Sequence, residues 1–195
     1  MILALFDFDG TVTTKDSMLE FMLYAVGKPS FYFRLLQISP ILILYKLHLI
    51  SNHSAKESLI SAVFKGWRYA LFEEVADTYS NDLLNEIIRP SAIEKIRWHQ
   101  QQGHKVVIVS ASIENWLREW CKKNNIDLIA TRLMVKGGKL TGRFEGRNCH
   151  GQEKVNRITA RYELSEYSDI YAYGDSPGDK AMLGIASKPY YRYFD

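Results

Sequence analysis

Carboxylates stand where two apolar runs end, and the two runs lie far apart in the chain. The run ILALF at 2–6 leads into Asp7 and Asp9, and DIYAYG at 169–174 leads into Asp175. Carboxylates held together without a partner repel one another, so that one of them takes up a proton. A divalent cation removes this conflict, and a site with oxygen ligands alone favours Mg²⁺, which binds one or two carboxylates together with a substrate phosphate. The residue types therefore indicate metal-assisted phosphoryl chemistry.

A sheet is the element that would bring these side chains to one edge. Apolar runs predict buried strands, and a glycine turn at 137–138 predicts a hairpin. The expected strands are 2–8, 105–109, 126–135, 139–144 and 169–174. The expected helices between them are 91–102, 113–124, 152–162 and 179–186. Strands separated by helices predict an α/β fold with a doubly wound, parallel, Rossmann-like sheet, and such sheets bind ligands beyond the carboxyl ends of their strands.

The span at 16–89 is predicted to be all-helical. Apolar residues recur there with three-to-four spacing, and no strand signal of comparable strength occurs. Ser54 with Glu57 has the form of a capping box that opens one of the helices. We therefore expect a catalytic core formed by residues 1–15 and 90–195, with a helical cap at 16–89 inserted after the first strand.

Four short motifs follow one another along the chain. They are DFDGT at 7–11, Ser110 in VIVSAS, Lys154 in GQEKV and GDSPGD at 174–179. With these motifs in this order, the chain resembles the haloacid dehalogenase superfamily, and more narrowly its phosphoserine phosphatase-like subfamily, in which a helical cap follows the first motif. The similarity extends over essentially the whole chain. The resemblance implies a Mg²⁺-dependent phosphatase, that is, a phosphoric monoester hydrolase.

The resemblance also implies a role for each motif residue. Asp7 would attack the phosphorus and form an aspartyl-phosphate, which splits one difficult hydrolysis into two easier steps. Asp9 would protonate the leaving oxygen and then deprotonate the hydrolytic water. Ser110 would donate a hydrogen bond to a phosphoryl oxygen, and Lys154 would supply a fixed positive charge.

The metal ligands are implied by the same resemblance. Asp175 would bind Mg²⁺ together with the carboxylate of Asp7 and the main-chain carbonyl of Asp9. Asp179 would act from outside the ligand set, by orienting a metal-bound water or Lys154.

Asp9 separates the reaction types known in the superfamily. Its dehalogenases lack an acid at this position, because halide leaves without protonation, so Asp9 indicates release of phosphate instead. Sugar phosphomutases keep both aspartates but resemble this sequence less around the cap. A non-catalytic phosphate-binding module on the same fold is a remote alternative, since it would be expected to lose the nucleophile or the metal carboxylates, and all of them are present.

Substrate contacts are expected from the backbone of Gly10 and Ala111, which would hold the phosphate, and from the cap, which would select the leaving group. Asp16 lies nine residues past Asp7, where phosphoserine phosphatases usually carry a glutamate that meets the substrate amine. A helix N-cap for residues 17 onward is the competing interpretation of Asp16. Gly178 stands where those enzymes commonly have an asparagine. We expect a small, phosphoserine-like phosphorylated metabolite as substrate.

Residues 31–50 form the most apolar stretch of the predicted cap. A membrane span needs about 20 mostly apolar residues, and this stretch is interrupted by Arg34, Gln37, Pro40, Lys46 and His48. Bacterial phosphatidylglycerophosphate phosphatases of the superfamily carry a similar stretch, together with a pattern similar to CHGQEKV at 149–155. A phospholipid substrate at the membrane surface is therefore the alternative. We favour the interpretation that the leucines and isoleucines of this stretch form the cap's own core: Leu35, Leu36, Ile41, Leu42 and Leu44.

Composition limits the remaining choices. The chain has 195 residues, 47% of them hydrophobic and 24% charged, with a net charge of +3, which is typical of a globular domain. The charge is too mild, and the basic residues too scattered, to predict a nucleic-acid partner. Cys121 and Cys149 predict neither a disulfide framework nor a zinc site. We expect a cytoplasmic protein, with peripheral membrane association as the alternative, and leave its oligomeric state open.

Overall fold

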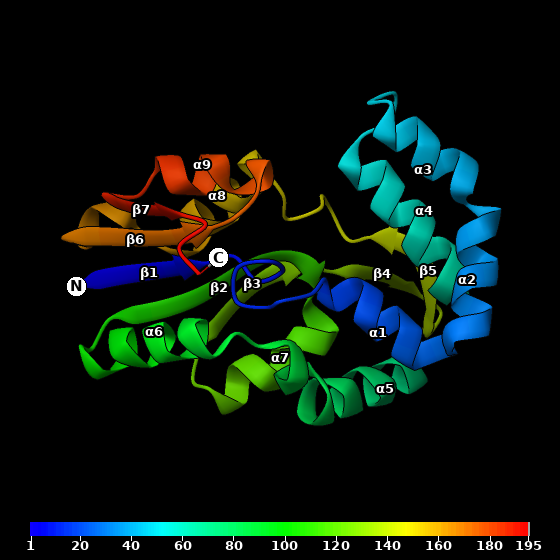
Figure 1. Cartoon of the computed structure of the whole chain (residues 1–195), viewed down its shortest axis with the longest axis horizontal. Helices are drawn as coiled ribbons and strands as arrows, with labels where there is room; N and C mark the ends of the chain where they lie inside the picture. Colours follow the sequence, from blue (N-terminus) through cyan, green and yellow to red (C-terminus); the bar gives the residue numbers. More distant parts are fainter. Residues whose placement is uncertain (195) are drawn as a thin grey trace.

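Five parallel strands form the central sheet of the computed structural model, which describes residues 1–194 (Figure 1). Their order is β3-β2-β1-β6-β7. Their bounds are Ile2–Phe6 for β1, Lys105–Ile113 for β2, Asp127–Thr131 for β3, Asp169–Gly174 for β6 and Lys188–Tyr191 for β7. The predicted α/β fold with a doubly wound parallel sheet is confirmed.

The sheet grows first to one side of β1 and then to the other. β2 and β3 are added on one side, and β6 pairs with the free edge of β1 before β7 completes the sheet. The strand order therefore reverses between β1 and β6. In an open α/β sheet, the crevice beyond the carboxyl ends of the strands at such a reversal is where ligands bind. The segments that follow β1 and β6 carry the predicted carboxylates.

The strand side chains alternate between two helical layers. Ala4 and Phe6 of β1 belong to the same buried cluster as residues of α6 and α7, whereas Leu3 and Leu5 belong to the cluster that includes residues of α8 and α9. The bounds of these helices are Pro90–Gln101 for α6, Glu114–Lys123 for α7, Gln152–Arg161 for α8 and Lys180–Gly184 for α9. The two pairs cover opposite faces of the sheet (Figure 1).

The segment between β1 and α6 is helical, as predicted. It contains α1 at Ser17–Val26, α2 at Lys28–Gln37, α3 at Ser39–Lys46, α4 at Asn52–Phe64, α5 at Tyr69–Asp82 and a 3-10 turn, η1, at Leu84–Ile87. Proline lies in the first turn of both α2 and α3, where the missing N–H has no helical partner to lose. The exact division into a core and a cap at 16–89 stays a prediction.

The predicted strand 126–135 is wrong as a single element. It splits at Arg132 into β3 of the main sheet and β4 at Leu133–Lys136, which pairs antiparallel with β5 at Lys139–Phe144. The chain leaves the sheet at Arg132, which is exposed and forms a 2.8 Å ion pair with Glu114 of α7. The hairpin packs against the cap helices instead: Gly66 N–H donates to the Leu140 carbonyl at 2.8 Å.

The predicted capping box at Ser54 is also wrong. α4 begins earlier, and its N-cap is Ser51, whose hydroxyl accepts from the Ser54 N–H at 3.1 Å. Glu57 is used elsewhere: its carboxylate accepts from the Phe144 N–H of β5 at 2.7 Å. The side chain that suggested a cap therefore fastens the hairpin to α4.

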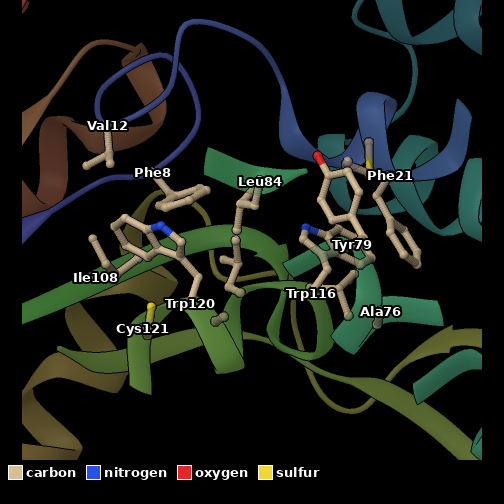
Figure 2. Packing of buried hydrophobic residues seen from close by; sticks show 14 of the residues in the cluster. Phe8, Val12, Phe21, Ala76, Tyr79, Leu84, Ile108, Trp116, Trp120 and Cys121 are labelled. Atoms are coloured by element: carbon tan, nitrogen blue, oxygen red, sulfur yellow. The ribbon is translucent and has the colours of Figure 1, made fainter. Parts of the chain in front are cut away.

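Aromatic side chains of α7 join the sheet to the cap (Figure 2). Trp120 meets Phe8 edge to face at 5.5 Å between ring centroids, and Trp116 stacks on Phe21 of α1 at 4.6 Å. Tyr79 of α5 meets the same Phe21 ring at 5.4 Å. All five rings belong to one buried cluster, so α1 and α5 are held against the segment that follows β1.

Candidate active site

A tight turn after β1 folds the chain back onto Asp7. The Asp7 N–H still donates to the Tyr173 carbonyl of β6 at 2.9 Å, and then the N–H groups of Val12 and Thr13 both donate to the Phe8 carbonyl. β1 therefore ends at Phe6, two residues before the predicted end. Asp7 itself is only 7% exposed.

Lys154 lies buried between two carboxylates. Its Nζ is 2.5 Å from Asp7 Oδ1 and 2.7 Å from Asp179 Oδ1, and the residue is 1% exposed. Burial alone would lower the pKa of Lys154, but the charges of Asp7 and Asp179 outweigh it and hold the pKa above its ordinary value. The lysine is therefore a fixed cation beside Asp7.

One lysine does not neutralise this cluster of acids. Burial raises the pKa of Asp7 to about 7, which the charge of Lys154 opposes and the charges of Asp179 and Asp9 reinforce. For Asp179 the balance is reversed: burial raises its pKa, but the charge of Lys154 and the hydrogen bonds from Lys154 and Ser176 leave it below its ordinary value. Asp7 is thus the carboxylate that lacks a full counter-charge.

Asp175 comes from the end of β6 and meets Asp7 through Thr11. The Thr11 hydroxyl lies 3.2 Å from Asp7 Oδ2 and 3.1 Å from Asp175 Oδ1. Gly10 lets Asp175 approach this closely. Its φ is +85°, and a Cβ there would lie 2.5 Å from Asp175 Oδ2, so position 10 requires glycine for its backbone angle and for space.

Asp179 has both of its carboxylate oxygens engaged. Oδ1 accepts from Lys154, and Oδ2 accepts from the N–H and the hydroxyl of Ser176 at 3.0 and 2.7 Å. The Asp175 N–H lies 3.3 Å from the same oxygen. Asp179 therefore orients Lys154 and fixes the loop that carries Asp175.

The donor set fits a hard divalent cation. Asp7, Asp175 and Asp179 each offer one oxygen, and these atoms lie within 4.8 Å of one another. Oxygen ligands suit Mg²⁺, which binds through one or two carboxylates and keeps several waters. Asp7, Asp175 and Asp179 are therefore the carboxylates placed to hold such an ion. The Asp9 carboxylate does not belong to this group of three.

Asp9 is held in place by cap and core together. Its Oδ1 accepts from the Ser17 N–H of α1 at 2.7 Å, and its Oδ2 accepts from the Ser112 hydroxyl at 2.5 Å. Ser112 and Ser17 also contact each other at 3.1 Å through their hydroxyls. Asp9 lies in the turn after β1, three residues past the end of the strand at Phe6.

Ser110 and Ala111 lie in an irregular stretch of β2. The pairing of β2 with β3 shifts between Ser110 and Ile113. Ser110 is fully buried and accepts from the Ser112 N–H at 2.9 Å, which leaves its hydroxyl proton for another acceptor. The predicted backbone contact of Gly10 with phosphate competes with an existing bond, since the Gly10 N–H donates to Thr13 Oγ1 at 3.2 Å.

Asp16 is the N-cap of α1. Its Oδ1 accepts from the Leu19 N–H at 3.0 Å, so the capping interpretation of this residue is confirmed. Burial raises the pKa of Asp16, the charge of Asp9 raises it further, and the charge of Lys56 partly offsets both. Lys56 reaches the site from α4 and lies 3.4 Å from the Ala111 carbonyl. Asp16 and Lys56 therefore place two opposite charges near each other.

Gly178 makes room for a histidine. A Cβ at position 178 would collide with His150 Nε2, so the imidazole occupies space that a larger residue at 178 would need. Burial lowers the pKa of His150, and the charges of Lys154 and Lys56 lower it further. The ring lines a cavity of about 600 Å³ between the start of α4 and the segment before α8, whose walls are Ser51, Asn52, His53, Arg147, Asn148, His150, Gln152 and Glu153.

Four contributors to the site were missed by sequence reasoning: Thr11, Ser17, Lys56 and Ser112. Ser112 follows Ser110 by two residues in VSAS, and this alternation was an available signal for a second side chain on the same side of the strand. Thr11 is part of DFDGT. Lys56 carries no local signal, because only the packing of α4 brings it to the crevice.

Known proteins resemble this chain in sequence. Residues 4–184 match the family model of haloacid dehalogenase-like hydrolases. Protein CicA of Caulobacter vibrioides is 33% identical over 195 residues, which cover 99% of this chain and 86% of the relative. A phosphoserine phosphatase of Archaeoglobus fulgidus is 30% identical over 141 residues, which cover 67% of this chain and 39% of that protein. The resemblance to the superfamily that the four motifs predict is therefore confirmed.

A solved structure shares the fold. A protein of unknown function from Bordetella pertussis Tohama I superposes with a TM-score of 0.81 at 22% sequence identity. The match covers 96% of this chain and 88% of that one. The arrangement of sheet and helices is thus shared over nearly the whole chain.

Proposed function

Because the chain belongs to the haloacid dehalogenase-like hydrolase family, we propose that it is a Mg²⁺-dependent phosphomonoester hydrolase that acts through an aspartyl-phosphate on Asp7. The observation that carries the proposal is the placement of Lys154 between Asp7 and Asp179, with Asp175 linked to Asp7 through Thr11. These carboxylates, of which Asp7 and Asp179 are buried and Asp175 is half-buried, are incompletely neutralised by Lys154 and so suit a bound cation.

Asp7 supplies the nucleophile in the first step. A carboxylate oxygen of Asp7 attacks the phosphorus, a new P–O bond forms, and the bond to the leaving oxygen breaks. Bound Mg²⁺, held by Asp7, Asp175 and the Asp9 carbonyl, would neutralise charge on the phosphoryl oxygens. Lys154 adds a positive charge from a fixed position, and Ser110 has a hydroxyl proton to donate to a phosphoryl oxygen, so most of the catalytic effect comes from preorganised electrostatics.

Asp9 moves the protons in both steps. It gives a proton to the leaving oxygen in the first step and takes one from the attacking water in the second, which releases inorganic phosphate and restores the Asp7 carboxylate. The hydrogen bonds from Ser17 and Ser112 fix the carboxylate for this work. Since Ser17 begins α1, the position of Asp9 depends on the placement of the cap.

The substrate we propose is a small, phosphoserine-like phosphomonoester. Asp16 and Lys56 both come from the helical segment and carry opposite charges that interact with each other, and Asp16 also interacts with Asp9. A leaving group with an ammonium and a carboxylate would complement this pair. The resemblance to a phosphoserine phosphatase supports the same substrate class.

The alternative substrate is a phosphatidylglycerophosphate at a membrane surface. One observation favours it: Leu36 is 71% exposed and Leu44 is 40% exposed, so the interpretation that these residues form the cap's own core is wrong for both. Leu35 and Leu42 are partly buried and pack against the core. A non-catalytic phosphate-binding module remains the third candidate, and the retained carboxylates argue against it.

The test is a comparison of phosphate release with Mg²⁺ and with EDTA. The purified protein is offered p-nitrophenyl phosphate, phosphoserine and phosphatidylglycerophosphate in detergent. We expect release only with Mg²⁺ and the highest kcat/KM for phosphoserine. A preference for the lipid would select the alternative substrate, and no release with any divalent metal would refute the enzyme.

Two variants test the substrate class. Asp16→Asn removes the charge but keeps a good N-cap residue, and Lys56→Gln removes the opposite charge. Each is expected to lower kcat/KM for phosphoserine by roughly tenfold while p-nitrophenyl phosphate changes little, since an ionic contact to the leaving group is worth about 1.4 kcal/mol or more. Lys65→Gln, at an exposed lysine one residue past α4, is the control. Equal losses of kcat/KM on both substrates would show that Asp16 and Lys56 do not bind the leaving group.

A further inference from the structure

Seven large apolar side chains on the outside of the cap are exposed to solvent. Leu36, Leu49, Phe33 and Leu47 are 62 to 71% exposed. We call the whole set the outer cap patch, formed by Tyr32, Phe33, Leu36, Ile43, Leu44, Leu47 and Leu49. Single exposed leucines are ordinary on protein surfaces, whereas a run of them on consecutive elements marks an interaction site.

The patch is the outward face of helices that are already packed on their inward face. Phe31 of α2 is buried, and Leu35 and Leu42 contact the core. Arg34 fastens α2 to α4 through a hydrogen bond to the Ala62 carbonyl. The outward residues recur with three-to-four spacing in both helices, so each helix carries a second apolar stripe that nothing in residues 1–194 covers. α3 contains no fully buried residue.

The charge around the patch has one sign. No Asp or Glu occurs between Glu20 and Glu57, whereas the same interval contains Lys28, Arg34, Lys46 and Lys56. Glu20 pairs with Lys15 at 3.3 Å, and Glu57 bonds to β5 and to His53. Lys28 and Lys46 are exposed, one at the start of α2 and the other at the end of α3. An apolar face flanked by cations is complementary to a partner whose interior is apolar and whose outer layer carries negative charge.

We propose that the outer cap patch docks the protein on an anionic lipid bilayer, with α2 and α3 lying in the headgroup region. The two helices form the edge of the molecule farthest from the sheet (Figure 1), so they can enter a bilayer surface without steric conflict with the core. None of the helices in residues 1–194 combines the length and apolar character of a membrane span. Interfacial helices need neither, because they bury one apolar face and leave their cationic residues at the headgroups.

A second copy of the chain fits this surface less well. In an isologous dimer the same patch faces itself. Lys28 and Lys46 would then approach the cations of the partner, and the interval from 21 to 56 contains no carboxylate to receive them. Charge complementarity therefore favours an anionic bilayer over a second copy of the chain as the partner of the outer cap patch.

The experiment is co-sedimentation of the full chain with vesicles. Vesicles of phosphatidylcholine are compared with vesicles that also contain phosphatidylglycerol, a phosphodiester that offers no monoester to the catalytic site. We expect binding to the anionic vesicles alone, weakened by added salt. Leu36→Ser and Leu47→Ser should each lower the partition coefficient by about tenfold or more, and Lys28→Gln and Lys46→Gln by roughly fivefold each.

Leu71→Ser is the matched control, because Leu71 of α5 is 48% exposed but lies outside the patch. It should bind vesicles like the wild type. Phosphatase activity on p-nitrophenyl phosphate in the same preparations should be unchanged in all these variants, so a failure of docking is distinguished from a failure of the proposed enzyme. Absence of binding, equal binding to neutral vesicles, or a dimer in light scattering that Leu36→Ser dissociates would each overturn the proposal.

Discussion

At the scale of residues, the site holds more negative than positive side chains. Asp7, Asp175 and Asp179 bring three carboxylates together, and Lys154 contributes one buried cation. A buried ion pair that loses one partner leaves the other charge unsolvated, which costs more than the pair itself is worth. Lys154 is therefore required by the fold as well as by the chemistry.

Lys154→Met should destabilise the protein by about 3 to 5 kcal/mol, because Asp7 and Asp179 lose their shared partner. For a chain of this size the melting temperature falls by roughly 10 °C. Added Mg²⁺ should raise the melting temperature of the variant more than that of the wild type, since the ion then relieves more repulsion. Lys123→Met, at an exposed lysine, is the control. Equal melting temperatures for the two variants would contradict the account.

The pH dependence of stability follows from Asp7. Its pKa rises from 3.8 to about 7 in the folded, metal-free protein. Between about pH 4 and pH 7 the folded state holds a proton that the unfolded state has lost, so this group makes stability fall as pH rises through that window. Asp7→Asn removes the effect.

In EDTA, Asp7→Asn should therefore be more stable than the wild type at about pH 8, by a few kcal/mol at most, and equally stable near pH 4. Urea unfolding at the two pH values measures the difference. A gap of the same size at both pH values would show that Asp7 does not titrate in this range.

Residue identities in the site were predictable where they follow strand ends. Asp7 and Asp175 could be found because each comes directly after an apolar run, and family motifs added Lys154. Ser112 and Lys56 could not be found in the same way. Their roles depend on the bulge in β2 and on the packing of α4, and neither leaves a periodic pattern in the sequence.

At the scale of elements, the hairpin β4–β5 shows where local signals fail. The stretch at 126–135 is mostly apolar, with Asp127, Thr131 and Arg132 as its polar residues, and it predicts one strand. The chain nevertheless turns at Arg132, and the hairpin bonds to Glu57 of α4 and, through Leu140, to Gly66 just after α4. These are contacts between segments far apart in sequence. The turn at 137–138 was predictable from its two glycines, because glycine tolerates a positive φ. Both residues have a positive φ in the structure.

Gly142→Ala should separate the hairpin from α4. Gly142 has a φ of +84°, and a Cβ there would lie 2.8 Å from the Ser61 Cα, an atom of the backbone that cannot move aside. Gly138 has a φ of +70° and open space around it, so Gly138→Ala carries the backbone strain alone. We expect a loss of about 1 to 2 kcal/mol for Gly138→Ala and roughly 1 to 3 kcal/mol more for Gly142→Ala.

Urea unfolding of the two alanine variants measures the difference. Equal stabilities would mean that β5 and α4 are not in close contact. Both glycines belong to the same hairpin and neither contacts the site, so the difference between the variants reports the contact of Gly142 with Ser61.

At the scale of the whole molecule, the helical segment between β1 and α6 contributes to the site. α1 holds Asp9 through the Ser17 N–H, and α4 brings Lys56 to the Ala111 carbonyl. The rings of Trp116, Phe21 and Tyr79 fix α1 and α5 against the core. The general division into a parallel sheet and a helical insertion was predictable from the alternation of elements. The exposure of α2 and α3 was not, because an apolar stripe has the same sequence pattern whether it faces a core or a bilayer.

The central claim is that Asp7 is the nucleophile of a phosphatase. The most direct measurement is turnover of p-nitrophenyl phosphate in Mg²⁺ by the wild type and by Asp7→Asn, with the fold of both checked by thermal unfolding. We predict that the variant stays folded and loses turnover by at least about a thousandfold, since an amide cannot form the aspartyl-phosphate. Turnover within about tenfold of the wild type would contradict the assignment of Asp7.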